Sequence, residues 1–359
     1  MITKETYDWV KKLLDPKITE LSDDDYDKLV KDYFRKDKTD WYREVDDRKK
    51  WDIEKVEQFW FLIGKYVFPE GDKHQFYNFS EFIFPKLINA FSISTYVFLR
   101  DARHKNFWMD LSHKVIPFEI SLKSAKFLDD LNFYNIEFAK DIDFKNVQFH
   151  GEFYTSLKCK FSGNVKFTNA VFYKNVFMPR IIKGNANFYQ TNFHNLANFI
   201  NTEFQSEVVF ENAIFKKDAY FNGCKFNESV NFEGADFSQL TLFIDTEFEK
   251  KVSFSDAEFK GDTNFYRTLF SDTASFDNSI FLEAKKIYFL DLKGNPLNLS
   301  FKNTIFSKSI LFRRIDFTNT TFLESDLTDV KFRECEWGEN YRIVLQDEKD
   351  IGKEEKDKL

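Results

Sequence analysis

Phenylalanine recurs along most of this chain at steps that alternate between five and six residues. In ANFYQTNFHNLANFINTEFQSEVVFENAIFKKDAYF, residues 186–221, it stands at 188, 193, 199, 204, 210, 215 and 221. The rhythm also spans 127–149, resumes at Phe161, continues to Phe281 with Ile182 in one place, and returns between Phe301 and Trp337. A tandem repeat of this kind determines the architecture of a chain before any local feature does.

An α-helix does not accommodate this rhythm, although 11-residue periods do occur in right-handed coiled coils. At about 100° per residue, five residues turn a helix by about 500° and six by about 600°. Alternate Phe side chains would therefore lie about 140° apart instead of on one stripe. The period must come from another secondary structure.

An extended strand explains the residues that precede each Phe. We consider the residue two places before each Phe of the run from Phe188 to Phe281. There are eighteen such residues, from Ala186 to Ser279, and all are small or β-branched. Because residues i and i−2 share one face of a strand, each unit directs one small and one large side chain inward. In the five-residue steps, the second position after Phe is occupied mostly by Gly, Asn and Asp, which tolerate the positive φ of tight turns. These positions are Gln190, Asn201, Asn212, Gly223, Gly234, Asp245, Asp256, Arg267 and Asn278.

The alternation of steps also predicts the number of sides. Coils of three units would alternate in length, whereas four units always give 22 residues and bring Phe188, Phe210, Phe232, Phe254 and Phe276 into register. The expected fold is therefore mainly β: a four-sided β-solenoid of about ten coils and roughly 45 Å, at about 4.8 Å between stacked strands.

Individual repeat units resemble a known family. Blocks such as FEGADF (232–237) and FSDAEF (254–259), and the plain five-residue rhythm of DFTNTTFLESDLTDVKF (316–332), are similar to the Phe-rich variety of pentapeptide-repeat proteins. The resemblance implies a right-handed quadrilateral β-helix. The best-described members of that family mimic DNA in shape and charge and bind type II topoisomerases.

The composition divides the chain into three parts. Residues 1–115 carry apolar stripes at helical spacing over 7–14, 26–34 and 53–67, which predict a mostly helical domain that covers the first coil. Residues 116–337 form the β-helix, with irregularities near 150–160 and 291–299. Residues 338–359 are a charged tail. We expect the far end of the solenoid to be covered by that tail, by 335–345, or by a second copy.

No residue pattern indicates catalysis, a cofactor or a metal site. Cys159, Cys224 and Cys335 each precede an inward aromatic by two, which predicts buried filler thiols. The histidines, at 74, 104, 113, 150 and 194, show no metal-ligand spacing. We therefore expect a protein that is not an enzyme; catalysis hidden within 1–115 is the weakest alternative.

The surface residues of the solenoid suggest two kinds of partner site. Between 186 and 281 there are 15 Asp and Glu against 7 Lys and Arg. The candidate acidic surface comprises Glu203, Glu247 and Glu249 on one side and Glu211, Glu233 and Asp277 on another. This negative charge either only keeps the protein soluble or makes the solenoid an anionic rod that competes with DNA for the basic cleft of a partner. A candidate partner surface comprises Ile200, Tyr220, Leu242, Ile244 and Tyr266, expected to stack into an apolar stripe.

These features leave two main functional hypotheses. The first is a non-catalytic scaffold that binds a protein partner of unknown identity; a homodimer through the C-terminal end or the apolar face is included. The second is a DNA mimic that modulates a topoisomerase or nuclease. The net charge of −7 argues against direct nucleic-acid binding. Because we find no signal peptide or apolar run of membrane-spanning length, we expect a cytoplasmic protein without a membrane span.

Overall fold

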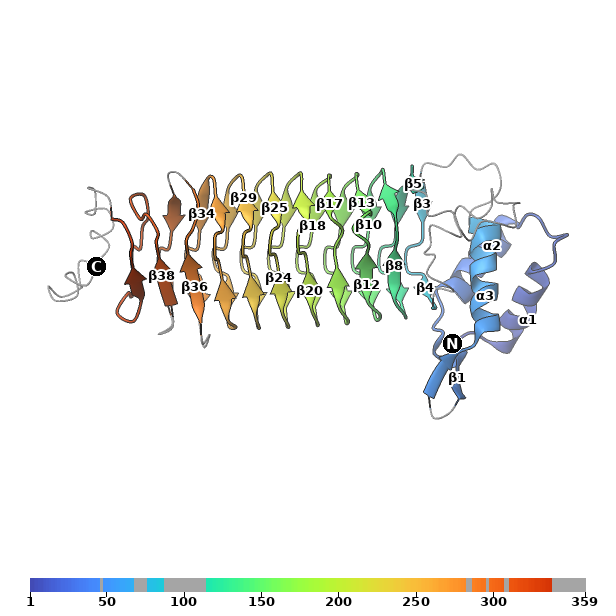
Figure 1. Cartoon of the computed structure of the whole chain (residues 1–359). Helices are drawn as coiled ribbons and strands as arrows, with labels where there is room; N and C mark the ends of the chain where they lie inside the picture. The colour runs from blue at the N-terminus through green and yellow to red at the C-terminus, as the bar shows by residue number, and fades with distance from the viewer. Residues whose placement is uncertain are drawn as a thin grey trace.

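The computed structural model describes residues 1–45, 48–67, 76–86, 114–281, 286–294, 297–306 and 310–337. It shows a long four-sided β-solenoid with a small, mostly helical domain at its N-terminal end (Figure 1). The predicted fold class, a mainly-β solenoid with helices near the N-terminus, is confirmed.

The N-terminal helices coincide with the three apolar stripes of the sequence. They are α1 (Lys4–Leu13), α2 (Asp23–Leu29) and α3 (Ile53–Leu62), with one-turn extensions η1 (Val30–Phe34) and η3 (Ile63–Val67) and a short η2 (Thr39–Trp41). The side chains of Thr3 and Ser22 accept hydrogen bonds from the first turns of α1 and α2, as N-caps do. An antiparallel hairpin of β1 (Tyr42–Val45) and β2 (Arg48–Trp51) was not predicted.

A buried lysine closes the end of η1. The Lys38 ammonium is fully buried and donates hydrogen bonds to the carbonyls of Tyr33, Phe34 and Lys36 at 3.0, 3.3 and 2.7 Å. Carbonyls at a helix end lack their full set of intrahelical donors, and the ammonium supplies one to each of these; the Tyr33 carbonyl also accepts the Lys36 N–H at 3.4 Å. Burial lowers the pKa of Lys38, and the nearby carboxylates of Asp37 and Asp40 act in the opposite direction.

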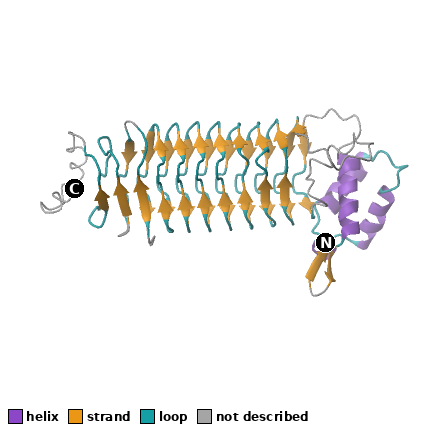
Figure 2. Ribbon diagram, in the orientation of Figure 1, coloured by secondary structure: helices purple, strands orange, loops and turns teal. Residues whose placement is uncertain are grey.

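Four parallel sheets form the faces of the solenoid, and the chain visits them in turn (Figure 2). Face 1 consists of β3 (Phe76–Asn78), β6 (Glu119–Ser121), β10 (Ile142–Asp143), β14 (Val165–Lys166), β18 (Ala186–Asn187), β22 (Val208–Val209), β26 (Val230–Asn231), β30 (Val252–Ser253), β34 (Thr273–Ser275) and β37 (Asn298–Ser300). Face 2 consists of β4 (Ile83–Phe84), β7 (Lys126–Phe127), β11 (Gln148–Phe149), β15 (Val171–Phe172), β19 (Asn192–Phe193), β23 (Ile214–Phe215), β27 (Asp236–Phe237), β31 (Glu258–Phe259) and β35 (Ile280–Phe281).

The other two faces complete each coil. Face 3 consists of β8 (Leu131–Phe133), β12 (Phe153–Thr155), β16 (Val176–Phe177), β20 (Ala197–Asn198), β24 (Ala219–Tyr220), β28 (Thr241–Leu242), β32 (Thr263–Asn264), β36 (Ile287–Leu290), β38 (Ile310–Arg313) and β39 (Lys331–Arg333). Face 4 consists of β5 (Lys114–Ile116), β9 (Ile136–Phe138), β13 (Lys160–Phe161), β17 (Ile181–Ile182), β21 (Glu203–Phe204), β25 (Lys225–Phe226), β29 (Glu247–Phe248) and β33 (Leu269–Phe270). The longest faces have ten strands, which agrees with the predicted ten coils.

The Phe ladder forms the core. The rings of the predicted column Phe188, Phe210, Phe232, Phe254 and Phe276 are fully buried and stack at centroid distances of 4.6–4.9 Å. All eighteen small or β-branched positions between Ala186 and Ser279 are at most 3% exposed. The inward pairing of one small and one large residue is therefore confirmed.

The corners follow the predicted turn chemistry. All nine turn positions named from the sequence have a positive φ, between 53° and 64°. Asn, Asp and Gly tolerate this conformation at little cost, whereas Gln190 and Arg267 adopt it against their intrinsic preference. Positive φ therefore belongs to the position two places after the Phe of a five-residue step, whichever residue occupies it.

Buried hydroxyls satisfy the carbonyls at these corners. The side chains of Thr202, Thr246 and Thr268 donate to backbone carbonyls of the preceding coil at 2.7–2.9 Å, and the Cys224 thiol occupies the equivalent place. These buried hydroxyls are thus paired, as burial favours, whereas the hydroxyls of Ser279 and Thr320 are buried without a hydrogen-bond partner among the described residues.

We expect Thr246→Val to lower the free energy of unfolding by about 1 kcal/mol, because the Phe221 carbonyl loses the hydroxyl that bonds to it at 2.7 Å. Chemical denaturation followed by circular dichroism measures this loss. Thr241→Val is the matched control: the Thr241 hydroxyl bonds at 3.3 Å to a carbonyl two residues away, so the control should change stability less. Equal losses in both variants would contradict the assignment.

The first coil begins before the expected boundary at residue 115. Strands β3 and β4, within 76–84, already pair with β6 and β7 of the next coil, and β5 pairs with β9. The helical part of the described chain therefore ends at Val67. A signal for this was present, since Phe79 and Phe84 stand five residues apart and both are buried.

The irregularity expected near 150–160 is an exchange of inward residues rather than a loop. Phe153 occupies the small slot and Thr155 the large one, so the order within β12 is reversed while the strand still pairs with β8 and β16. The Thr155 hydroxyl donates to the Phe177 carbonyl at 2.8 Å. Near 291–299, where 295–296 lie outside the described residues, an isolated bridge joins Lys293 to Leu269 of β33, and regular pairing resumes at Asn298, where β37 pairs with β34.

Candidate functional site

Face 3 carries an outward column of unusual composition. Direct strand register places ten side chains one above another along the solenoid: Asn132, Tyr154, Phe177, Asn198, Tyr220, Leu242, Asn264, Tyr288, Leu311 and Lys331. We call this set the face-3 column. Six of its ten members are aromatic or aliphatic, so it is the natural place to look for a partner surface.

The five residues of the candidate partner surface occupy two lines rather than one. Tyr220 and Leu242 are register neighbours in the face-3 column. Ile200, Ile244 and Tyr266 instead follow the inward Phe at the corner between faces 3 and 4. There, backbone hydrogen bonds between successive coils place Asn222 between Ile200 and Ile244. The expected single stripe is thus a column on the face with a second, interrupted line beside it.

Sequence reasoning missed the two ends of this surface. Tyr134, Tyr154 and Phe177 form a ring cluster at the N-terminal end of face 3, with centroids 5.5 and 5.8 Å apart. Tyr288 and Leu311 continue the column towards the C-terminal end. Exact 22-residue spacing places Tyr154 correctly but misplaces Phe177, Tyr288 and Leu311, because the steps 154–177, 264–288 and 288–311 are longer than 22 residues.

The acidic residues of face 4 do not form a continuous negative band. Lys225 stands in register between Glu203 and Glu247. Its ammonium pairs with Glu247 at 3.3 Å and with Glu249 at 3.4 Å, and these contacts raise the pKa of Lys225. The three predicted acidic residues therefore do lie on one face, but a cation divides them.

The second acidic group lies at the corner between faces 1 and 2. Glu211 and Glu233 are neighbours there, and Ser255 separates Glu233 from Asp277. Asn231 donates to the Glu211 carboxylate at 3.2 Å, and Ser300 donates to Asp277. Both acidic groups are thus short and hydrogen-bonded to their neighbours.

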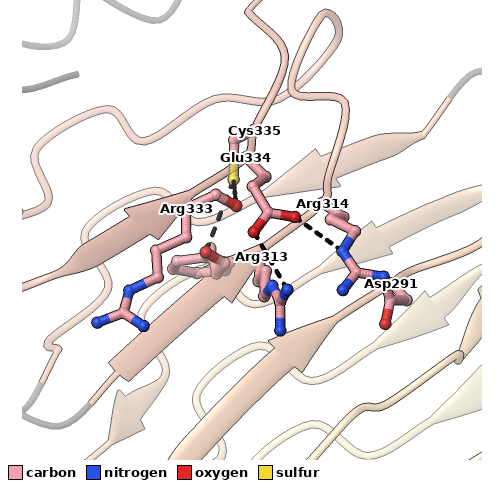
Figure 3. Close-up of polar contacts among 7 residues, drawn as sticks. Asp291, Arg313, Arg314, Arg333, Glu334 and Cys335 are labelled. Atoms are coloured by element: carbon pink, nitrogen blue, oxygen red, sulfur yellow. Dashed lines mark hydrogen bonds and ion pairs between the residues drawn. The ribbon is translucent and has the colours of Figure 1, made fainter.

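Charges also alternate at the corner between faces 3 and 4 near the C-terminal end. Figure 3 shows Arg314 between Asp291 and Glu334, at 3.1 and 2.9 Å, and Arg313 also reaching Glu334 at 3.1 Å. The Arg333 side chain points away from this group (Figure 3). Because these arginines are exposed and paired, the corner contributes little to stability and forms no open basic patch.

The cysteines behave as expected for core residues. Cys159 and Cys224 are buried, and their thiols donate to the carbonyls of Phe133 and Phe199. Burial raises the pKa of the Cys224 thiol, which disfavours the reactive thiolate. Cys335 is half-buried; its thiol contacts the Arg333 carbonyl (Figure 3), and burial again raises its pKa.

The two described histidines lie in one outward column along face 2, with Tyr173 between them and Lys216 beyond His194. His150 stacks on Tyr173 at 4.7 Å, and His194 lies near Lys216 at a face-2 corner. Positions 74, 104 and 113 and the tail 338–359 lie outside the described residues. Among the residues that the structure describes, no three His, Cys, Asp or Glu lie close enough to hold a metal ion. Within the same ranges, no helix has the length and apolarity of a membrane span.

One cavity lies between the helical domain and the first coil. Its volume is about 570 Å³, and its lining includes Tyr26, Lys65, Tyr66 and Tyr77. The Lys65 ammonium already donates to the carbonyls of Leu13 and Asp15, both at 2.8 Å. The positive charge beside this cavity is therefore used to join helices.

Comparison with known proteins identifies the repeats in the middle of the solenoid. Residues 181–225, 210–242, 221–269 and 243–284 match the family model of pentapeptide repeats, which spans nine copies. Residues 181–284 are thus pentapeptide repeats. The crystal structure of HetL, a pentapeptide repeat protein involved in heterocyst differentiation regulation in the cyanobacterium Nostoc, is similar over 68% of this chain and 94% of HetL. The identity is 14% and the TM-score 0.33. A search of curated proteins gives no match to this pentapeptide-repeat protein.

Proposed function

We propose that this pentapeptide-repeat protein is a non-catalytic binding protein that uses face 3 to hold a protein partner. The observation that carries the proposal is the face-3 column, in which Tyr and Leu or Phe side chains stand outward on a rigid wall. Aromatic and aliphatic side chains fixed on parallel strands lose little conformational freedom on binding, which favours affinity.

The other faces offer less to a protein partner. The outward residues of face 1 in the same coils are Asn187, Val209, Asn231, Ser253 and Ser275, which are mostly small and polar. Face 4 presents carboxylates that Lys225 and neighbouring amides already engage. An apolar, poorly charged centre is the usual composition of an interface core. The outward residues of face 2 include Val171, Ile214 and Ile280, but Asp236 and Glu258 stand between them, so face 3, which carries no charge from Asn132 to Leu311, fits this composition best.

A DNA mimic is the alternative function. It would require carboxylates spaced like duplex phosphates along the rod. In the pentapeptide-repeat array, Lys225 pairs with Glu247 and Glu249, and Lys260 pairs with Asp236 and Glu258, both at 2.7 Å. These ion pairs interrupt the acidic rows, so we favour the apolar face.

We expect Tyr220→Lys and Leu242→Lys each to weaken partner binding by roughly 10- to 100-fold, because a charge replaces an apolar side chain at the interface centre. The measurement is affinity capture from the native host, followed by titration of the purified partner. Ser253→Lys, outward on face 1, is the matched control and should bind normally. If face-3 variants bind normally and charge reversal at Glu203, Glu247 and Glu249 abolishes capture, the DNA mimic is the better account.

A further inference from the structure

The face-3 column repeats with a period of three coils. Read from β8 to β39, its order is Asn, Tyr, Phe, then Asn, Tyr, Leu, then Asn, Tyr, Leu, and finally Lys. The inward pattern does not require this, because the core repeats in every coil. The longer period on the outside of this face is therefore a property separate from the core.

Resting on the proposed function of face 3, we propose that its partner is a second copy of this chain, packed face to face and antiparallel. The two-fold axis passes between Tyr220 and Leu242, the fifth and sixth of the ten places. Isologous packing of this kind brings each place of one copy against its counterpart from the opposite end of the other.

The column is complementary to itself in this orientation. Tyr154 meets Leu311, Phe177 meets Tyr288, and Tyr220 meets Leu242, so that every apolar residue faces another apolar residue. Each Tyr faces a Leu or Phe rather than a second Tyr, and facing layers pack best when side chains of different size oppose each other. In a parallel pair each Tyr would instead face the same Tyr of the second chain, and each Leu the same Leu. Large side chains would then oppose large ones and smaller ones oppose smaller ones, so the gap between the faces would be uneven.

The polar places match as well. Asn198 faces Asn264 of the second copy. In each of these residues Oδ1 accepts a backbone N–H two residues on, at 2.9 Å, which fixes the side chain. Within the described part of the chain, neither side-chain NH₂ group donates a hydrogen bond. In the antiparallel pair each amide donates to the Oδ1 of the other, which still has a lone pair.

The spacing of the column favours a solenoid over other partners. Its side chains are separated by the distance between strands, about 4.8 Å, along the whole length of the face. An α-helix repeats at about 5.4 Å per turn and loses register within a few turns. A second copy has the same spacing and the same three-coil period, so its residues stay in register from end to end.

The available area predicts a reversible dimer. Ten strands at about 4.8 Å, each roughly 10 Å wide across the face, give roughly 500 Å² per copy. The total, roughly 1,000 Å², lies at the lower limit for a specific interface. We therefore expect a monomer–dimer equilibrium that shifts with protein concentration.

Sedimentation velocity of the full chain over a range of concentrations tests this inference. The unaltered protein should shift from monomer to dimer, and Leu242→Lys should remain monomeric, because each lysine would bring a charge against Tyr220 of the other copy and the two lysines would lie one strand apart across the axis. Lys331 already stands in the same column, so an outward lysine is compatible with the fold; Tyr220→Lys provides a second variant. Ser253→Lys, the face-1 control, should dimerise normally. Circular dichroism melting confirms folding of each.

Cross-linking with a short bis-maleimide tests the orientation in a Cys335→Ala background, since Cys159 and Cys224 are buried. A mixture of Asn198→Cys and Asn264→Cys should form a dimeric product that neither variant forms alone. Self-linking of Asn198→Cys would overturn the antiparallel arrangement. A monomer at every concentration, or a Leu242→Lys dimer, would overturn the dimer itself. A different partner that is lost on Leu242→Lys would then still support the proposed function.

Discussion

Phe232→Asp is expected to abolish the cooperative unfolding transition of the solenoid at ordinary temperature. The ring is fully buried and stacks on Phe210 and Phe254 at 4.8 and 4.9 Å, while Phe221 meets its edge at 5.4 Å. Loss of the ring alone costs about 3–5 kcal/mol. The carboxylate adds the cost of an unpaired buried charge, and the sum approaches the stability of an ordinary domain.

Thermal unfolding followed by circular dichroism measures this effect. Ser253→Asp is the matched control, since Ser253 is the outward neighbour of Phe254 on the same face and its Oγ accepts the Ser255 N–H, which an Asp carboxylate can also accept. Phe232→Leu should retain the fold with a smaller loss, because a large apolar side chain still occupies the slot. If Phe232→Asp melted like the control, the inward assignment of the Phe ladder would be wrong.

The solenoid could be predicted in detail because each coil contacts only its neighbours. In such arrays the local rules repeat, and a rule that holds for one coil holds for the next. The inward Phe, the small residue two places before it and the positive-φ corner each depend on fewer than six consecutive residues. This is why positions as different as Gln190, Gly223 and Arg267 were identified by place alone and all have positive φ.

The features that were not predicted depend on departures from the local rule. In β12 the large and small inward residues exchange places at Phe153 and Thr155, and a search for Phe at a fixed step reads this as a break. The start of the solenoid was placed too late because residues 87–113 separate β4 from β5, so the Phe rhythm at Phe79 and Phe84 stands apart from the main run.

The candidate surface was only partly predictable for a related reason. Outward residues form a column only when the number of residues in every coil is known. Tyr220 and Leu242 lie in a run of regular coils and were found, whereas Tyr288 follows a longer coil and was not. The pairing of Lys225 with Glu247 and Glu249 likewise needs the register between coils, which composition does not supply.

Trp60→Ala is expected to loosen the junction between the helical domain and the first coil. Trp60 is fully buried and stacks on Phe84 of β4, with centroids 5.8 Å apart and planes at 17°. Its indole N–H donates to the Lys86 carbonyl at 3.0 Å. Removal of a buried Trp costs about 3–5 kcal/mol, through the cavity it leaves and the carbonyl that loses its donor.

Hydrogen exchange distinguishes the local effect of Trp60→Ala from a general loss of stability. The amides of β4 and β7 should exchange faster, while those of β26 and β30, many coils away, should change little, because coils couple only to their neighbours. Phe61→Ala is the matched control, since Phe61 is 46% exposed on the same helix. Faster exchange confined to the helices, with β4 and β7 still protected, would mean that the first coil is stable without the domain that packs on it.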